Sequence, residues 1–431
     1  MKICLVTAFP PSARQLNEYA LHLANELQQN VLIDLTIIGD VLEVADYATD
    51  ASGKKIAVDQ LPELPGFNVM RVWRPGDLLN PWRILRAVRA VKPDVVWFNL
   101  VFSSFATQHN PAAAFLGLCT PALTRMAGYY THVTMHNLIE HVDFAGTGIR
   151  HEKLFRTASM LATRILTMAN SISVLLPSFR KTMVNKYKPV DIHFRFHGIL
   201  GTRPEFPDFS GRGNPEHRIL AIGHWGTYKR LETLMEAFAV VSKQVPEAKL
   251  IVAGANHHTM PGYWESIREQ YGSNRQIEFL GYVPEEQIPE LFASCTLVVL
   301  PYNSATGASG PAHQACQYGV SLISSDIPDF IEMAEDLGMA INFYRRGDAS
   351  DLADKMIALL RSPQLQRDTA EQNFSVALRM TMPAVIRQYL RSFERKHAMK
   401  SLQAIGRFRR VPPWAPMRSV LFNPKKQKVI F

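Results

Sequence analysis

The chain has four cysteines in 431 residues, and no two of them form a C-x-x-C pair. This scarcity argues against a disulfide framework, a redox dithiol and a zinc knuckle, and it fits a reducing compartment. The chain contains no apolar stretch of 18 residues without a charged residue. The apolar run at the amino terminus is far shorter than the core of a signal peptide. We therefore expect a cytoplasmic protein that neither spans a membrane nor carries a secretion signal.

Acidic residues are absent from the last part of the chain. From Arg395 to Phe431 there are ten basic residues and no acidic one, whereas the preceding residues contain 37 basic and 38 acidic side chains. The net charge of +9 therefore arises in the tail. Basic residues near an anionic leaflet each favour binding by about 1 kcal/mol, so we expect residues 397–431 to hold the protein on the cytoplasmic face of a membrane. The alternative is a basic extension without a partner.

Recognised DNA- or RNA-binding signatures are lacking in the sequence, so we expect no nucleic acid partner.

Short runs rich in Ile and Val alternate with longer segments at helical spacing, which is typical of βαβ units and buried parallel sheets. The first series of strand candidates is 3–7, 32–38, 94–98, 132–135 and 172–176. The second series is 218–222, 248–253, 277–281, 296–300, 320–324 and 339–343. Between the series lies TRPEFPDFSGRGNP, which is rich in proline and glycine.

The pattern predicts an α/β fold of two doubly wound, Rossmann-like domains, residues 1–201 and 216–380, joined by a linker at 202–215. We expect a C-terminal helix, 381–396, to pack back on the first domain, followed by the basic tail, 397–431. Ligands of open α/β sheets bind at the carboxyl ends of the strands, so the site is expected in a cleft between the domains.

Two loops of the second domain carry residues suited to an anion. After the strand 218–222 the chain reads GHWGTYKRLETL, with Lys229 close to a predicted helix start. Glycine N–H groups, a helix start and a lysine together suit a diphosphate, although a solvated lysine at a tight turn fits the same pattern. After the strand 296–300, the small residues from Gly307 to Gly310 precede Pro311, which suits the first turn of a helix.

From residue 1 to about Phe393 the chain resembles the retaining glycosyltransferases of family 4, which have the GT-B architecture. The family's G-x-x-x-x-x-K element, which holds the donor diphosphate, corresponds to Gly223–Lys229, with His224 where the family often has arginine. The family's hallmark aligns with TGASGPAHQACQYG, in which Thr306 and Gln314 replace the two glutamates. The residues that the resemblance implies at the donor are Gly223, His224, Tyr282, Val283, Thr306, Gly307, Ala308, Ser309, Gly310 and Gln314.

Polar residues also follow the strand 132–135 of the first domain, in the segment HNLIEHVDF. Within the resemblance, the histidine that closes this strand points at the donor sugar, and His136 is the match. We therefore expect His136 and Lys229 to be the catalytic residues. The acceptor-side candidates are Arg14, Asn17, Glu140, His141 and Asp143. The spacing of this cluster fits no zinc pattern, and the fold generally works without a metal, so no metal or cofactor is expected beyond the nucleotide-sugar donor.

The resemblance implies a retaining hexosyltransferase that uses a nucleotide-diphosphate sugar and a glycan or lipid-linked acceptor. The alternative is a non-catalytic GT-B relative that acts as a binding or scaffold subunit, because both hallmark glutamates are replaced. A further segment, PWRILRAVRAVKP, places Arg83, Arg86 and Arg89 at three-residue spacing beside Trp82. A solvated helix face is the usual explanation of such spacing, and contact with a membrane is the alternative.

Overall fold

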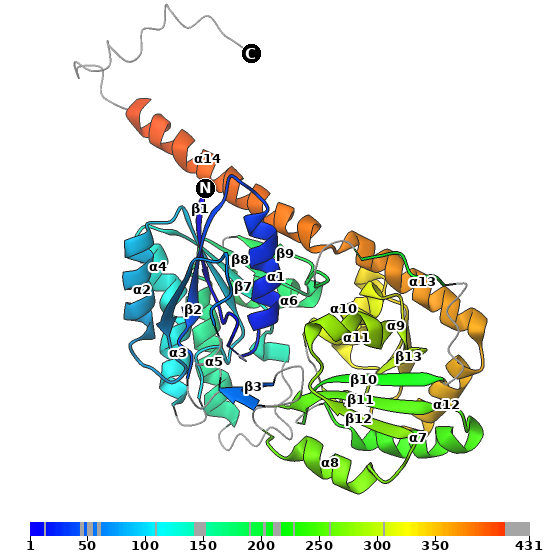
Figure 1. Ribbon diagram of the computed structural model, residues 1–431. Helices are drawn as coiled ribbons and strands as arrows, with labels where there is room; N and C mark the ends of the chain where they lie inside the picture. The colour runs from blue at the N-terminus through cyan, green and yellow to red at the C-terminus, as the bar shows by residue number, and fades with distance from the viewer. Residues whose placement is uncertain are drawn as a thin grey trace, which may run out of the picture. The chain divides into compact units, whose positions relative to one another are not determined.

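The structure is a computed structural model, and it describes residues 1–12, 14–43, 47–49, 55–57, 62–107, 110–141, 152–188, 191–200, 204–209, 217–226, 229–257, 260–304 and 307–409. The chain divides into two compact units, Met1–Val385 and Ile386–Phe431. The first unit contains two parallel sheets flanked by helices (Figure 1). We call residues 1–200 of this unit the first lobe and residues 204–379 the second lobe.

The first lobe contains a seven-stranded parallel sheet in the order β5-β2-β1-β6-β7-β8-β9. Its strands are β1 (Lys2–Val6), β2 (Asp34–Asp40), β5 (Val69–Trp73), β6 (Val95–Leu100), β7 (Tyr130–Met135), β8 (Ser171–Val174) and β9 (Ile192–Phe194). A separate antiparallel pair is formed by β3 (Tyr47–Thr49) and β4 (Lys55–Ala57). The helices are α1 (Asn17–Gln28), α2 (Asn80–Val91), α3 (Pro111–Leu118), α4 (Thr120–Met126), η2 (Ile139–His141), α5 (Glu152–Leu166) and α6 (Pro177–Tyr187).

The second lobe contains a six-stranded parallel sheet in the order β12-β11-β10-β13-β14-β15. Its strands are β10 (Arg218–Trp225), β11 (Lys249–Asn256), β12 (Ile277–Gly281), β13 (Leu297–Leu300), β14 (Ser321–Ser325) and β15 (Ile341–Tyr344). The helices are α7 (Glu232–Gln244), α8 (Tyr263–Tyr271), η3 (Glu285–Gln287), α9 (Ile288–Ala293), α10 (Gly310–Gln317), α11 (Pro328–Leu337), α12 (Ala349–Leu360) and α13 (Pro363–Arg379).

Each sheet has one point at which the strand order reverses. In the first sheet β1 pairs with both β2 and β6, and in the second β10 pairs with both β11 and β13. Loops that leave the two strands at such a point run to opposite faces of the sheet, so a crevice opens at the carboxyl ends of these strands. The strand order therefore selects the loops after β1, β6, β10 and β13 as those that can hold a ligand.

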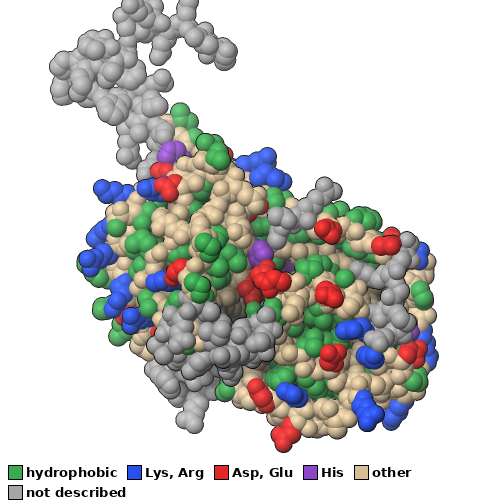
Figure 2. Space-filling model, in the orientation of Figure 1, with side chains coloured by type: hydrophobic (Ala, Val, Ile, Leu, Met, Phe, Trp, Pro, Cys, Tyr) green, Lys and Arg blue, Asp and Glu red, His purple; other side chains and the backbone are tan. Residues whose placement is uncertain are grey.

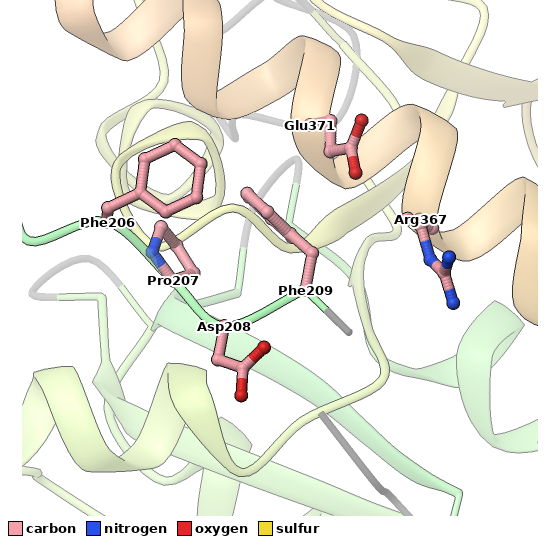
Figure 3. Close-up of a pocket in the computed structure, with 6 residues that line it drawn as sticks. All are labelled: Phe206, Pro207, Asp208, Phe209, Arg367 and Glu371. Atoms are coloured by element: carbon pink, nitrogen blue, oxygen red, sulfur yellow. The ribbon is translucent and has the colours of Figure 1, made fainter. Parts of the chain in front are cut away.

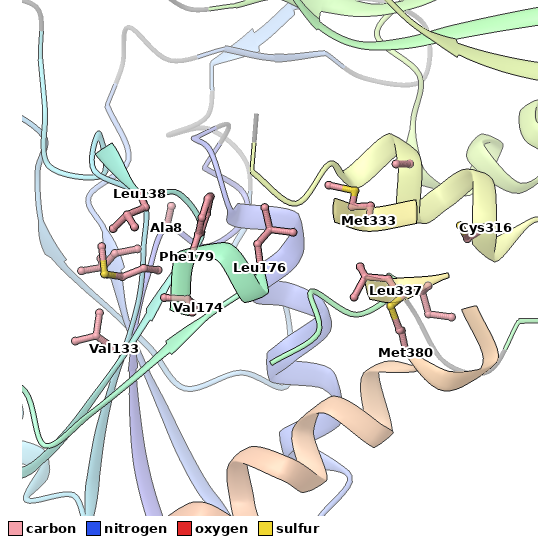
Figure 4. Close-up of a cluster of buried hydrophobic side chains, with 14 of the residues drawn as sticks. Ala8, Val133, Leu138, Val174, Leu176, Phe179, Cys316, Met333, Leu337 and Met380 are labelled. Carbon is pink, nitrogen blue, oxygen red and sulfur yellow. The ribbon is translucent and has the colours of Figure 1, made fainter. Parts of the chain in front are cut away.

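A buried apolar cluster includes residues of both lobes. Leu176 and Phe179 at the start of α6 lie in the same cluster as Met333 and Leu337 of α11, and α6 and α11 are in contact (Figure 4). Phe179 is 1% exposed and Met333 is 0% exposed, so this apolar surface is removed from water. Burial of a large apolar side chain contributes about 2 kcal/mol, and the cluster therefore stabilises the contact between the lobes.

The predicted linker, 202–215, is described over residues 204–209, and these residues lie against α13 (Figure 3). The rings of Phe206 and Phe209 lie 5.3 Å and 6.0 Å from that of Phe374 on α13. A pocket is lined by residues 206–209 together with Arg367 and Glu371 of α13. Figure 3 shows Asp208 and Glu371 on opposite sides of this pocket. The division of the chain at this linker stays a prediction.

The second unit begins inside the last helix, α14 (Met382–Arg409). This helix continues well beyond the predicted end at 396, into the segment that the sequence suggested as a tail. Residues 410–431 lie outside the described residues, and the packing of α14 on the first domain stays a prediction. Across the described helices, none is both long and apolar enough to cross a bilayer.

The prediction of an α/β fold with two parallel, doubly wound sheets is confirmed. Most predicted strands agree with the structure to within two residues at each end, and 277–281 agrees at both ends. The strand series for the first domain did not include β5. Arg71 in the middle of β5 interrupts the apolar run, and its guanidinium is held by the Glu63 carboxylate at 2.7 Å and the Phe9 carbonyl at 2.8 Å.

Candidate functional site

Lys229 lies where the strand order of the second sheet reverses. It follows β10, and it forms a β-bridge with Tyr302, which follows β13. The Lys229 Nζ atom lies 4.9 Å from the centre of the buried Tyr302 ring. A Cβ atom added to Gly223, near the end of β10, would lie 3.6 Å from the same Nζ, an ordinary van der Waals distance, so the ammonium group lies directly beside Gly223. The structure thus places one positive charge at the carboxyl edge of the sheet.

Near Lys229 a helix starts close by, as predicted, but the N–H group of Gly226 is not open. The sequence suggested open glycine N–H groups and a helix that starts close to Lys229. In the structure the Gly226 N–H donates to the Lys229 carbonyl at 3.1 Å, and α7 begins at Glu232. The N–H of Leu231 donates to the Tyr263 hydroxyl at 2.8 Å. These two N–H groups are therefore used inside the protein.

The small-residue loop after β13 is held by a buried carboxylate. Gly307 has φ +72°, which favours glycine, and its N–H donates to Asp329 at 2.6 Å. Asp329 lies in the first turn of α11 and is 1% exposed. It was not among the predicted site residues, although it lies in the segment SSDIPDF that the family resemblance covers. Its role is to fix the loop that precedes α10.

The predicted helix after this loop is present as α10, with Pro311 in its first turn. Ser309 precedes it in an extended conformation and is 3% exposed. The carbonyl of Ser309 accepts a hydrogen bond from Nδ1 of His313 at 2.8 Å. Burial lowers the pKa of His313 to about 3, so this imidazole is neutral at physiological pH. The amino-terminal end of α10 follows the loop of small residues after β13, at the same carboxyl edge of the second sheet as Lys229.

His136 follows β7 in the first sheet and is 8% exposed. Its Nε2 lies 2.7 Å from Asn99 Oδ1 on β6, and the amide nitrogen of Asn99 donates to Thr7. The amide oxygen therefore accepts from the Nε2–H, which leaves Nδ1 as the acceptor nitrogen of a neutral imidazole. Desolvation, followed by the nearby His197, holds the pKa of His136 well below its usual value.

A cluster of aromatic rings extends from His136 towards the second lobe. Tyr19 on α1 packs edge-on against His136 with ring centres 4.7 Å apart, and its hydroxyl donates to the His197 carbonyl at 2.8 Å. The rings of His197 and His313 lie 4.8 Å apart, and they come from different lobes. This pair joins the end of the first lobe to α10.

The remaining donor-side predictions fall in three environments. Tyr282 and Val283 follow β12, and Tyr282 is 45% exposed. Ala308 and Gln314 are partly buried, and His224 is exposed near the end of β10. Thr306 lies outside the described residues. The roles of these residues stay predictions.

The acceptor-side candidates are engaged within the first lobe. Arg14 lies 2.9 Å from Glu43 and 3.4 Å from the buried carboxylate of Asp40, and the amide of Asn17 donates to the Ser12 carbonyl at 2.6 Å. These contacts fix the loop after β1. They leave the roles of Arg14 and Asn17 towards an acceptor as predictions.

The side chains of Glu140 and His141, which follow His136, contact α6. Glu140 accepts hydrogen bonds from the Tyr187 hydroxyl and from Lys186 Nζ, the latter at 3.2 Å. Nε2 of His141 lies 2.9 Å from the Thr182 hydroxyl. Asp143 lies outside the described residues. The sequence grouped these side chains correctly after one strand, but two of them tie the loop to a helix.

Two polar contacts between the lobes were not predicted. Nε2 of His22 on α1 lies 2.5 Å from Glu285 in η3, and the Glu332 carboxylate on α11 accepts from both the N–H and the hydroxyl of Ser178 on α6. The Glu332 contact places a carboxylate at the amino-terminal end of α6, where the helix dipole favours it. Partners so far apart in sequence leave no local signal.

Comparisons with known proteins support one family. Residues 202–375 match the family model described as glycosyl transferases group 1. The GDP-mannose:cellobiosyl-diphosphopolyprenol alpha-mannosyltransferase of Xanthomonas oryzae is 21% identical, over 82% of this chain and 86% of its own. Two further curated relatives are covered over less than two thirds of their lengths, 30% and 64%.

Solved structures show the same fold. Sucrose-phosphate synthase from Thermosynechococcus elongatus superposes with a TM-score of 0.70 at 15% identity, covering 93% of this chain and 100% of its own. Anabaena HepE in complex with UDP-glucose superposes with a TM-score of 0.66 at 14% identity, covering 91% and 99%. The chain therefore has the GT-B fold, and its residues 202–375 are similar to the glycosyl transferases group 1 family.

Proposed function

We propose that this protein transfers a hexosyl group from a nucleoside-diphosphate sugar to a hydroxyl of a glycan or lipid-linked acceptor, with retention of the anomeric configuration. The observation that carries the proposal is the position of Lys229. Its ammonium group lies beside Gly223 and over the Tyr302 ring, at the point where the second sheet reverses its strand order. A diphosphate there meets a full positive charge at the edge where this class of sheet binds ligands.

The reaction breaks the bond between the anomeric carbon and the diphosphate oxygen, and it forms a bond from that carbon to the acceptor hydroxyl oxygen. Negative charge develops on the departing diphosphate, and Lys229 and the amino-terminal end of α10 stabilise it. Preorganised charge of this kind is usually the largest single contribution of such a site. The departing phosphate oxygen takes the acceptor proton, so no covalent nucleophile from the protein is required.

His136 is proposed to position the donor sugar. Because its Nε2–H is donated to Asn99, its Nδ1 is the nitrogen that can accept a hydrogen bond from a sugar hydroxyl. The neutral state of the imidazole suits this role, since a buried cation beside a developing oxocarbenium ion would oppose the reaction.

The comparisons support the choice of substrate classes. The Xanthomonas relative is named for transfer from GDP-mannose to a diphosphopolyprenol-linked cellobiosyl acceptor, and the Anabaena structure holds UDP-glucose. Both names contain a nucleotide-linked hexose, and one contains a lipid-linked acceptor. We therefore propose a nucleotide hexose as donor and favour a lipid-linked saccharide as acceptor.

A second candidate is a non-catalytic binding or scaffold subunit. It is favoured by Gln314, because this amide stands in α10 where the resemblance places a carboxylate. An amide can still bridge two hydroxyls of a ribose, but it contributes no charge.

The experiment is an assay of nucleoside diphosphate release by the full-length protein. UDP- and GDP-linked hexoses are supplied one at a time, with and without a diphosphopolyprenol-linked disaccharide. Acceptor-dependent release from one donor, together with a glycosylated lipid product, supports the transferase. Binding of a sugar nucleotide without release, with every acceptor tested, supports the scaffold.

A further inference from the structure

The helices α2, α3, α4 and α5 of the first lobe contain almost no acidic residues. Their sequences contain seven Lys and Arg residues, and Glu152 is their single acidic residue. This composition is unusual for a chain in which residues 1–394 have nearly equal numbers of basic and acidic side chains. The positive charge of these helices is therefore local, and it is separate from the charge of the C-terminal tail.

The basic residues lie on the outward sides of these helices. On α2, Ile84 and Val88 are buried, whereas Arg86 and Arg89 are exposed at three-residue spacing. On α5, Arg164 is exposed. Figure 2 shows Lys and Arg side chains spaced along the side of the molecule that α2 and α4 form in Figure 1.

Large apolar side chains are exposed among these charges. Trp82 is 62% exposed, Met126 is 74% exposed, and Leu161 and Met168 are 51% and 45% exposed. Each of these belongs to α2, α4 or α5 or to the turn after α5. We call the exposed residues Trp82, Arg86, Arg89, Arg125, Met126, Leu161, Arg164 and Met168 the basic-apolar face.

The members of this face form one surface rather than scattered positions. Helix α2 packs on α4, and α4 contacts α5. The guanidinium of Arg125 on α4 donates a hydrogen bond to the Met168 carbonyl, which joins α4 to the turn after α5. Cations and large apolar side chains are therefore neighbours across three helices.

We propose that the basic-apolar face docks on the surface of a membrane leaflet that contains anionic lipids. Its charge complements acidic headgroups, and Trp82, Met126, Leu161 and Met168 supply the apolar groups that enter the boundary between headgroups and acyl chains. Trp is a residue that prefers this boundary. Arg86 and Arg89 lie side by side on α2, and Arg164 lies on α5, so the three cations can meet more than one headgroup.

The sequence assigned membrane contact first to the tail, and it gave membrane contact only as the alternative for the segment that contains Trp82, Arg86 and Arg89. The proposal places the contact on the folded first lobe, in residues that are distant in sequence from Arg395–Phe431. It also does not require the transferase reaction, because docking depends on charge and apolar surface alone.

The test uses the full-length chain and sedimentation with vesicles of phosphatidylcholine, with or without phosphatidylglycerol. Each basic residue favours binding about fivefold, and the new carboxylates are repelled, so the variant Arg86→Glu, Arg89→Glu, Arg164→Glu is expected to bind the anionic vesicles more weakly than the parent by about 100-fold or more. The matched control is Lys243→Glu, Arg275→Glu, Lys355→Glu, which makes the same charge change at exposed positions of the second lobe. Its binding is expected to stay within about fivefold of the parent.

Two further variants separate the contributions. Trp82→Ala with Met126→Ala keeps every charge and is expected to weaken binding at high salt, where charge is screened. Lys425→Glu, Lys426→Glu, Lys428→Glu changes only the tail and should leave most of the binding. The proposal is overturned if the tail variant alone loses binding, if the face variant and the control behave alike, or if the parent binds duplex DNA and not anionic vesicles. Circular dichroism verifies that each variant is folded.

Discussion

The carbonyl oxygen of His136 lies against Gly307, so closely that a Cβ atom on Gly307 would come within 2.8 Å of it. His136 follows β7 of the first sheet and Gly307 follows β13 of the second. Real Cβ atoms essentially never approach a backbone atom this closely, so the contact requires glycine. The carboxyl edges of the two sheets therefore meet at these residues, next to the loop that precedes α10.

Gly307→Ala is expected to destabilise the protein. The alanine would have to adopt φ +72° and also displace the His136 carbonyl, and a left-handed conformation alone costs about 1 kcal/mol. We expect a loss of at least 2 kcal/mol in the free energy of unfolding, measured by urea titration. Gly310→Ala is the control, because no atom lies within 4 Å of its added Cβ, and its stability should equal that of the parent. Equal midpoints for both variants would contradict the contact.

Glu332→Ala tests the contact between α11 and α6. The change leaves the N–H and hydroxyl of Ser178 without the carboxylate that accepts from them, and such a loss typically costs about 1 to 3 kcal/mol. Glu335→Ala, an exposed position on the same helix, is the matched control. Thermal unfolding at constant pH measures both. A control that loses as much as Glu332→Ala would show that the effect is one of helix propensity rather than of the cross-lobe bond.

Folding stability is expected to fall as the pH is lowered from 6.5 towards 4. Burial lowers the pKa of His197 to about 4, partly offset by its bond to the Gly198 carbonyl, so the unfolded state binds its proton first. The neutral imidazole therefore stabilises the fold above the unfolded pKa, and this stability is lost as the pH falls through that window. His197 alone contributes about 3 kcal/mol to this loss.

His197→Phe should flatten the pH dependence, because phenylalanine fills the position between Tyr19 and His313 without titrating. Urea midpoints at several pH values give the slope. A His197→Phe variant as acid-sensitive as the parent would assign the effect to other groups.

Replacing Thr306 and Gln314 with glutamate tests the altered hallmark. If the site is adapted to its present donor, two new carboxylates beside a bound diphosphate should weaken donor binding about tenfold or change the preferred sugar. Isothermal titration with the donor and its nucleoside diphosphate measures the change. A faster reaction with the same donor would instead indicate that activity had been lost at these positions, and it would favour the scaffold function.

The fold could be predicted because both faces of a parallel sheet are buried, so each central strand is a continuous apolar run in the sequence. The strand β10 contains such a run, and its residues Ile219–Ile222 are all buried. β5 escaped this reasoning because the charge of Arg71 is compensated by Glu63 and by backbone carbonyls, which only the folded chain brings together.

Residues of the candidate site could be predicted only where they belong to a short sequence motif. Lys229 and Gly307 belong to short segments with recognisable spacing, and the structure places both at the carboxyl edge of the second sheet. Tyr302 beneath Lys229 and Asp329 beneath Gly307 depend on pairing between separate βα units. The ring contact of His197 with His313 joins the two lobes, and nothing in the neighbouring residues of either histidine indicates it.

The proposed contact of Lys229 with the departing diphosphate is tested most directly by the rate of nucleoside diphosphate release by Lys229→Met at saturating donor and acceptor. Loss of one preorganised charge at a developing anion typically lowers the rate by about 100-fold or more. Lys229→Arg, which keeps the charge, should retain more of the rate, and Lys243→Met on the exposed side of α7 should retain all of it. We expect a Lys229→Met protein with the urea midpoint of the parent and about 1% of its rate. Turnover at the parent rate by the folded variant would contradict the assignment of Lys229 to the departing diphosphate.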